Sequence, residues 1–268
     1  IRNDKLDEIL DFEFSSKKLV LKIENETDYK KKNETGNLKI SFKNKNNIFE
    51  YQINENTLDV ISKDNNKLFK VLIEFKPFYL VSNFKYQTFR IKDLLNNLFF
   101  MEILKSQVLN NKNLNAKINF DVKNVYDFDR FSDLSLKLKI EEGNYNFSNS
   151  NIIWKENVKV SFLDAFLNFD KEKINLNGRT SFDVKNQDEF FKFFQIKKDL
   201  RKNIGKIELD FNYDLNEEKI TFDNLRIDSK SNRKIEEIVS NFNSNSKKFF
   251  NKVTFKNFVN DLLVAYFG

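Results

Sequence analysis

The chain has 268 residues, of which 40% are hydrophobic and 31 are Phe, so it holds enough apolar material for a folded core. Its 46 Lys and Arg residues against 40 Asp and Glu residues give a net charge of +6, and it contains no Cys and no His. Disulfides, thiolate metal sites, Cys nucleophiles and imidazole chemistry are therefore excluded. Length alone leaves open one large β domain or two smaller ones.

The basic balance is weak support for nucleic-acid binding. Lys supplies most of the positive charge, and Arg, which contacts bases and phosphates bidentately, is scarce. Phe residues also alternate with Lys along the chain, which places aromatic and basic side chains on opposite faces of a strand. We therefore expect a solvated, Lys-rich surface and no nucleic-acid partner.

Alternation of apolar and polar residues predicts antiparallel strands, each with one apolar face and one wet face. Pro77 indicates an edge or a bend, Gly178 takes an in-facing position, and a register break at Asn224 indicates a bulge. Asn, Lys and Glu clusters at 44–47 and 216–218 predict turns built without Pro or Gly. In chain order the alternating segments are 38–42, 68–84, 114–122, 134–140, 158–162, 174–184, 207–215 and 220–227.

Three segments have helical spacing instead. Residues 92–109 form a predicted amphipathic helix between two strand blocks. Asn186 followed by Glu189 resembles an N-cap with its reciprocal acid, opening a short Phe-rich helix. The terminal segment is helical over 255–266, and the polar stretch 229–251 is expected to hold a short helix and a loose linker.

The predicted fold is mainly β: a long, curved antiparallel sheet with an apolar inner face, groove-like, and a few short amphipathic helices. Residues 1–110 form a strand block that ends in the helix at about 92–109. Residues 111–268 form a second β region with the terminal helix, and the two parts make one continuous sheet. The apolar face must be covered, either because the sheet folds over or closes on itself or because an apolar ligand binds there. Alternation alone does not distinguish an open groove from a closed sandwich.

The sequence contains no recognisable catalytic motif. The chain lacks GxGxxG, P-loop and GxSxG patterns, and its 5 Gly are too few for a phosphate cradle plus the usual turns. Glu208, Asp210 and Asp214 share one strand face, as a glycosidase pair or a Ca²⁺ site would require. Apolar residues alternate with them, so this acidic row is most simply the solvent side. We expect no enzyme activity, no catalytic residues, no metal and no cofactor.

A specific order of features runs through residues 172–268. It consists of NGRTSFDV at 177–184, FFQI at 193–196, IELDFNYDL at 207–215, ITFDNLRID at 220–228 and NKVTFKNFVNDLLVAYFG at 251–268. This order resembles the C-terminal region of AsmA-like proteins of Gram-negative, especially alphaproteobacterial, envelopes. A weaker likeness extends back to about residue 70.

The resemblance implies a periplasmic protein held in the inner membrane by one N-terminal helix. Such proteins form long β-grooves with apolar interiors, and larger relatives are implicated in phospholipid movement towards the outer membrane. The chain opens at Ile1 and lacks the anchor, so we expect it to be cut from something longer.

Three hypotheses follow. The first is a segment that binds or conducts phospholipid acyl chains and supports outer-membrane lipid homeostasis. The second is a closed-core structural or assembly module of outer-membrane biogenesis, which binds envelope proteins through an apolar patch or a free strand edge. The third, a carboxylate enzyme acting on envelope glycans, ranks last.

For the first hypothesis, in-facing residues are the expected lipid contacts, and the terminal helix is expected to cap the sheet or to touch a membrane or a partner. The expected lipid contacts are Ile118, Phe120, Leu136, Leu138, Val160, Phe162, Leu176, Phe182, Leu209, Phe211 and Phe222. The expected contacts of the terminal helix are Phe255, Phe258, Leu262 and Leu263.

Overall fold

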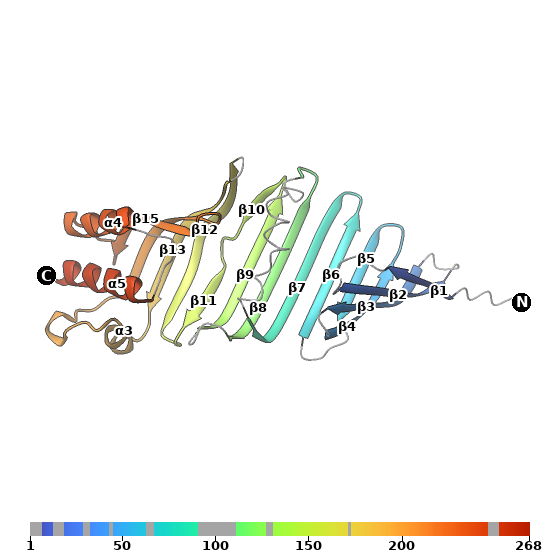
Figure 1. The fold of residues 1–268 in the computed structure, drawn as a ribbon, viewed down its shortest axis with the longest axis horizontal. Coiled ribbons are helices and arrows are strands. Elements are labelled where there is room, and N and C mark those ends of the chain that lie inside the picture. The colour runs from blue at the N-terminus through green and yellow to red at the C-terminus, as the bar shows by residue number, and fades with distance from the viewer. Residues whose placement is uncertain are drawn as a thin grey trace, which may run out of the picture.

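A computed structural model describes most of the chain as one sheet with helices gathered at its C-terminal end (Figure 1). Among the described residues no helix has both the length and the apolar composition to span a bilayer. The predicted helix at 92–109 lies outside the described residues. Those residues are 7–12, 19–28, 33–42, 45–62, 67–90, 111–126, 131–170, 173–245 and 252–268.

The mainly β fold predicted from the sequence is confirmed. In the described part of the chain fifteen strands form a single sheet, and nearly all of them pair in chain order. The strands are β1 (Asp7–Phe12), β2 (Leu19–Asp28), β3 (Asn33–Phe42), β4 (Lys45–Ile53), β5 (Thr57–Ser62), β6 (Lys67–Phe75), β7 (Phe78–Phe89), β8 (Asn115–Val125), β9 (Phe131–Glu141), β10 (Asn144–Asn146), β11 (Asn151–Trp154), β12 (Val158–Asp170), β13 (Lys173–Val184), β14 (Lys206–Asp214) and β15 (Lys219–Ile227). Short strands β10 and β11 both lie between β9 and β12.

One strand pair departs from the expected antiparallel sheet. β7 and β8 are parallel, with Leu80 opposite Ala116 and Phe84 opposite Phe120. Apolar alternation is the same for both pairing directions, so it does not reveal this reversal. β7 ends before residue 110 and β8 begins after residue 111. The hydrogen bonds of this pair therefore connect the two parts of the chain, 1–110 and 111–268, that were expected from the sequence.

The helices among the described residues are α3 (Gln187–Phe194), α4 (Arg233–Asn245) and α5 (Lys252–Phe267), and a 3₁₀ turn, η1, spans Lys198–Leu200. The predicted N-cap of α3 is present, because the side chain of Asn186 accepts a hydrogen bond from the backbone N–H of Glu189 at 3.3 Å. The terminal helix expected over 255–266 is also confirmed as α5.

Turns use polar residues where many proteins place Gly. Left-handed backbone occurs at Glu142, Lys155, Glu156 and Asn224, among others. The register of β14 with β15 shifts between Glu208 and Asp210, which confirms the expected bulge near Asn224. The expected turn at 216–218 is present, whereas β4 already begins at Lys45 inside the expected turn at 44–47.

Buried side chains form two cores. The larger core packs α3, α4 and α5 against the C-terminal strands and contains Ile196, Ile204 and Leu263 at its centre. The smaller core spans β8, β9, β10, β12 and β13 and includes Ala116 and Tyr145. Burial of apolar area in these cores supplies the main driving force for folding this end of the sheet.

Candidate functional site

A row of aromatic rings crosses strands β4, β6, β7 and β8. Ring centroids are 5.0 Å apart for Phe49 and Phe69, 4.9 Å for Phe69 and Phe84, and 6.0 Å for Phe84 and Phe120. All four side chains are half-buried. We call Phe49, Phe69, Phe84 and Phe120 the aromatic row. Apolar side chains left partly open to solvent in a continuous series are candidates for contact with a ligand.

Strand register builds this row. Phe69 lies opposite Phe84 in the β6–β7 pair, and Phe84 lies opposite Phe120 in the parallel pair, so the three rings share one face. Phe49 belongs to β4, and its partner on the intervening strand is the small residue Ser62. The short side chain leaves room for the rings of Phe49 and Phe69 to meet over β5.

Tyr86 and Phe89 extend the row at the end of β7. Their rings lie 5.4 and 4.9 Å from the ring of Phe120. Aromatic pairs in this range of distances and with tilted planes are favourable beyond their buried area. Burial raises the pKa of the Tyr86 hydroxyl above its ordinary value.

Four of the expected lipid contacts continue the same face into β9. Ile118 lies opposite Leu138, and Phe120 lies opposite Leu136. All four are half-buried, and Leu138 also packs against the smaller core. The structure therefore brings these four together with the aromatic row.

The other expected lipid contacts lie in or against the helix-covered core. Leu209, Phe211 and Phe222 are buried there, with exposed fractions of 6%, 8% and 7%. Four further residues are partly buried and pack against that core: Val160, Phe162, Leu176 and Phe182. The structure thus separates the eleven expected lipid contacts into four beside the aromatic row on β8 and β9 and seven in or against the larger core.

The terminal helix faces the sheet. Phe258, Leu262 and Leu263 are buried in the larger core, and Phe255 packs against it. The ring of Phe258 lies 5.5 Å from Phe222 and 4.4 Å from Phe242, so one aromatic cluster joins β15, α4 and α5. Of the roles expected for this helix, capping the sheet is the one that these contacts describe.

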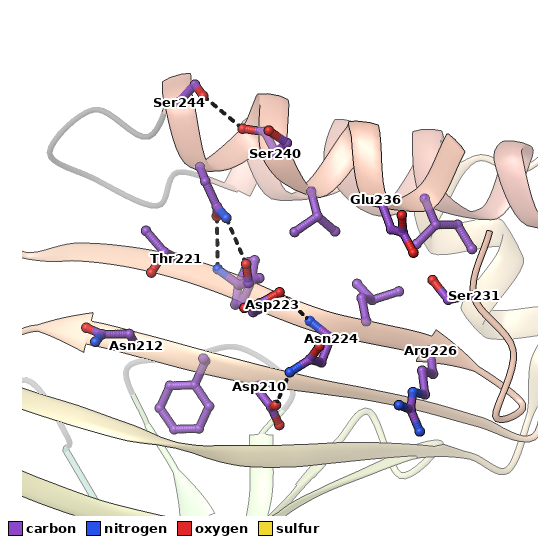
Figure 2. A pocket seen from close by; sticks show the side chains of 16 residues that line it. Asp210, Asn212, Thr221, Asp223, Asn224, Arg226, Ser231, Glu236, Ser240 and Ser244 are labelled. Carbon is purple, nitrogen blue, oxygen red and sulfur yellow. Dashed lines mark hydrogen bonds between the residues drawn. The ribbon is translucent and has the colours of Figure 1, made fainter. Parts of the chain in front are cut away.

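A second candidate is a groove of about 750 Å³ between α4 and the last two strands, lined by both polar and apolar side chains (Figure 2). Its floor carries Asp210, Asp223 and Asn224, joined by hydrogen bonds, and Ser240 and Ser244 lie on α4 above it. The amide of Asn224 donates to Asp210 at 2.7 Å. No group of three or more His, Cys, Asp or Glu residues suited to a metal ion occurs in the part of the chain that the structure describes.

Electrostatics in this groove disfavour proton transfer by Asp210. Arg179 Nε lies 2.9 Å from a carboxylate oxygen of Asp210. Partial burial raises the pKa of Asp210, but hydrogen bonds from Arg179 and Asn224 outweigh burial and hold that pKa below its ordinary value. Asp210 is therefore ionised at neutral pH and already paired, which suits a structural contact better than a general acid.

Local hydrogen bonds close the strand edge beside this groove. The side-chain amide of Asn243 on α4 accepts from the backbone N–H of Phe222 at 2.9 Å and donates to its carbonyl at 2.7 Å. The backbone N–H of Asn224 donates to the Asp223 side chain at 2.8 Å. An added strand at β15 would have to break these bonds, so this edge is a poor docking site for a partner strand.

Sequence reasoning missed Phe49, Phe69 and Phe84. Phe69 and Phe84 lie in the segment recognised as strand-like, so their positions were available as a signal. Their contact with Phe49 depends on the register of three strand pairs, from β4 to β7. Alternation within one strand does not predict the register between strands.

No protein-family model, no curated protein and no solved structure matches this chain.

Proposed function

We propose that this chain is a lipid-binding segment of a periplasmic envelope protein anchored to the inner membrane. It binds or conducts phospholipid acyl chains along the face that carries the aromatic row, and thereby supports outer-membrane lipid homeostasis. The observation that carries the proposal is the half-buried series from Phe49 to Phe120. The resemblance of residues 172–268 to AsmA-like proteins gives the proposed compartment and ligand class.

The chemistry of this face suits acyl chains. Each buried CH₂ group contributes ~0.8 kcal/mol, so contact with even half an acyl chain would hold a lipid usefully. Aromatic rings and aliphatic side chains offer no directional bonds, so they accept chains of different length and leave the headgroup in water. No cofactor is needed for this activity.

The first experiment is native mass spectrometry with lipid extraction on the chain purified without detergent. We expect one or more phospholipid molecules per chain. In the double variant Phe84→Ser with Phe120→Ser, retention should fall by about tenfold or more, because a buried Phe side chain contributes ~1.5–3 kcal/mol and ~1.4 kcal/mol is tenfold in affinity.

Leu68→Ser is the matched control. Leu68 is 47% exposed and lies next to Phe69 in β6, so its side chain points to the opposite face. The control should keep its lipid, and circular dichroism should show all variants folded. A folded wild type that never carries lipid would contradict the proposal and favour the protein-binding assembly module.

A further inference from the structure

Two Lys side chains from distant segments meet at one aromatic ring. The ammonium nitrogen of Lys155, in the turn after β11, lies 4.4 Å from the centroid of the Phe193 ring on α3. The ammonium nitrogen of Lys256, on α5, lies 4.8 Å from the same centroid. Trp154 packs edge-on against Phe193 at 4.6 Å. All four side chains are half-buried, so the cations remain within reach of solvent.

This cluster lies between the larger core and strand β9. Trp154 packs against the larger core on one side. On the other side its register partner is Phe131 on β9, the strand that carries Leu136 and Leu138. A lipid whose acyl chains lie on β8 and β9 would therefore have the two Lys side chains one strand away, at the end of the face.

The two ammonium nitrogens approach the same ring, at 4.4 and 4.8 Å from its centroid. Two positive charges at one ring raise the local positive potential, which attracts an anion that contacts both groups. Lys is a point-charge donor well suited to phosphate oxygens. The indole and phenyl rings beside it suit the boundary between an apolar chain and a polar headgroup.

The geometry points to a phosphate-binding site formed by Lys155 and Lys256 around Phe193, which holds the phosphodiester of a phospholipid whose acyl chains lie on β8 and β9. This inference rests on the proposed function and adds the position and charge of the headgroup. The helices α3 and α5 then have a second role besides covering the core, since each supplies part of the headgroup site.

The test compares two labelled lipids with the same acyl chains: phosphatidylglycerol, which carries a phosphate, and diacylglycerol, which does not. Both are titrated without detergent into the wild type and into the double variant Lys155→Gln with Lys256→Gln. We expect phosphatidylglycerol to bind the double variant about tenfold more weakly and diacylglycerol to bind it unchanged. Raising the salt concentration should weaken phosphatidylglycerol binding to the wild type only.

Lys192→Gln is the control. Lys192 lies next to Phe193 on α3, and its ammonium nitrogen lies 2.9 Å from a carboxylate oxygen of Glu189. Equal weakening of both lipids by the double variant, or no weakening of either, overturns the phosphate site. If the wild type binds neither lipid, the proposed function fails, and glycerol 3-phosphate then decides the site by itself. NMR shifts at the Lys155 and Lys256 ammonium groups on adding it support a site for free phosphate, and their absence overturns the inference.

Discussion

At the residue scale, Gly178 in β13 has no room for a side chain. It lies opposite Ala165 on one neighbouring strand and Phe211 on the other. A Cβ atom placed on Gly178 would lie 2.1 Å from the carbonyl oxygen of Asp164. The neighbour is backbone at a bulge in β12, so it cannot rotate away as a side chain would.

We therefore expect Gly178→Ala to lower the free energy of unfolding by about 3 kcal/mol, measured by urea denaturation. Gly205→Ala is the comparison, because the nearest atom to its added Cβ is 3.4 Å away and belongs to the Asp228 side chain. The comparison should lose less than about 1 kcal/mol. Similar losses for both variants would show that close approach at Gly178 is not the cause.

Asp210 gives the protein a pH-dependent contribution to stability. Its pKa is lowered in the folded state, chiefly by the hydrogen bonds from Arg179 and Asn224 acting against burial. A lowered pKa means that this stabilisation is complete above the ordinary value of about 3.9 and is lost as pH falls through the folded-state pKa. Asp210→Asn should thus have a lower urea midpoint than the wild type at pH 7. The gap should close as pH drops below about 3.9, and a gap independent of pH would refute this assignment.

At the element scale, one side-chain amide of α4 bonds to the backbone of the last strand. The two hydrogen bonds between Asn243 and the backbone of Phe222 attach the helix to the outer edge of β15. The rings of Phe222 and Phe242 stack at 5.2 Å beside this contact. Polar bonds and ring packing therefore fix α4 in the same place.

Asn243→Ala should destabilise the protein by about 1–2 kcal/mol, because it leaves a part-buried backbone N–H and C=O without their partner. It should also raise the tendency to aggregate, since it opens the strand edge. Ser244→Ala serves as the control, because Ser244 is exposed and its hydroxyl donates to the Ser240 carbonyl within α4. Denaturant unfolding and light scattering measure the two effects, and equal behaviour of the two variants would argue against the edge contact.

At the scale of the whole molecule, sequence periodicity predicted the later strands well and the earlier ones poorly. β8, β9 and β12–β15 carry regular alternation and were predicted, as were α3 and α5. β4 opens with Lys and Asn residues that are typical of a turn, yet pairing with β3 holds it extended. β10 has three residues, too few to show a period. In these strands, pairing with neighbouring strands outweighed the local conformational preference of the residues.

The candidate site was predictable only in part, for a physical reason. Ile118, Phe120, Leu136 and Leu138 were recognised from alternation, which gives the face of each side chain. Alternation does not say what covers that face, so Phe211 and its neighbours were expected to contact lipid although helices cover them. The convergence of Lys155 and Lys256 on Phe193 depends on the packing of α3 and α5, which has no local signature.

The Asn243 contact at β15 also limits how copies of this chain could associate. A sheet that lengthens without end by strand addition needs an open edge on both sides of every copy. Here the β15 side is closed by hydrogen bonds from the Asn243 side chain. Strand addition at β15 therefore does not propagate this sheet into a fibre.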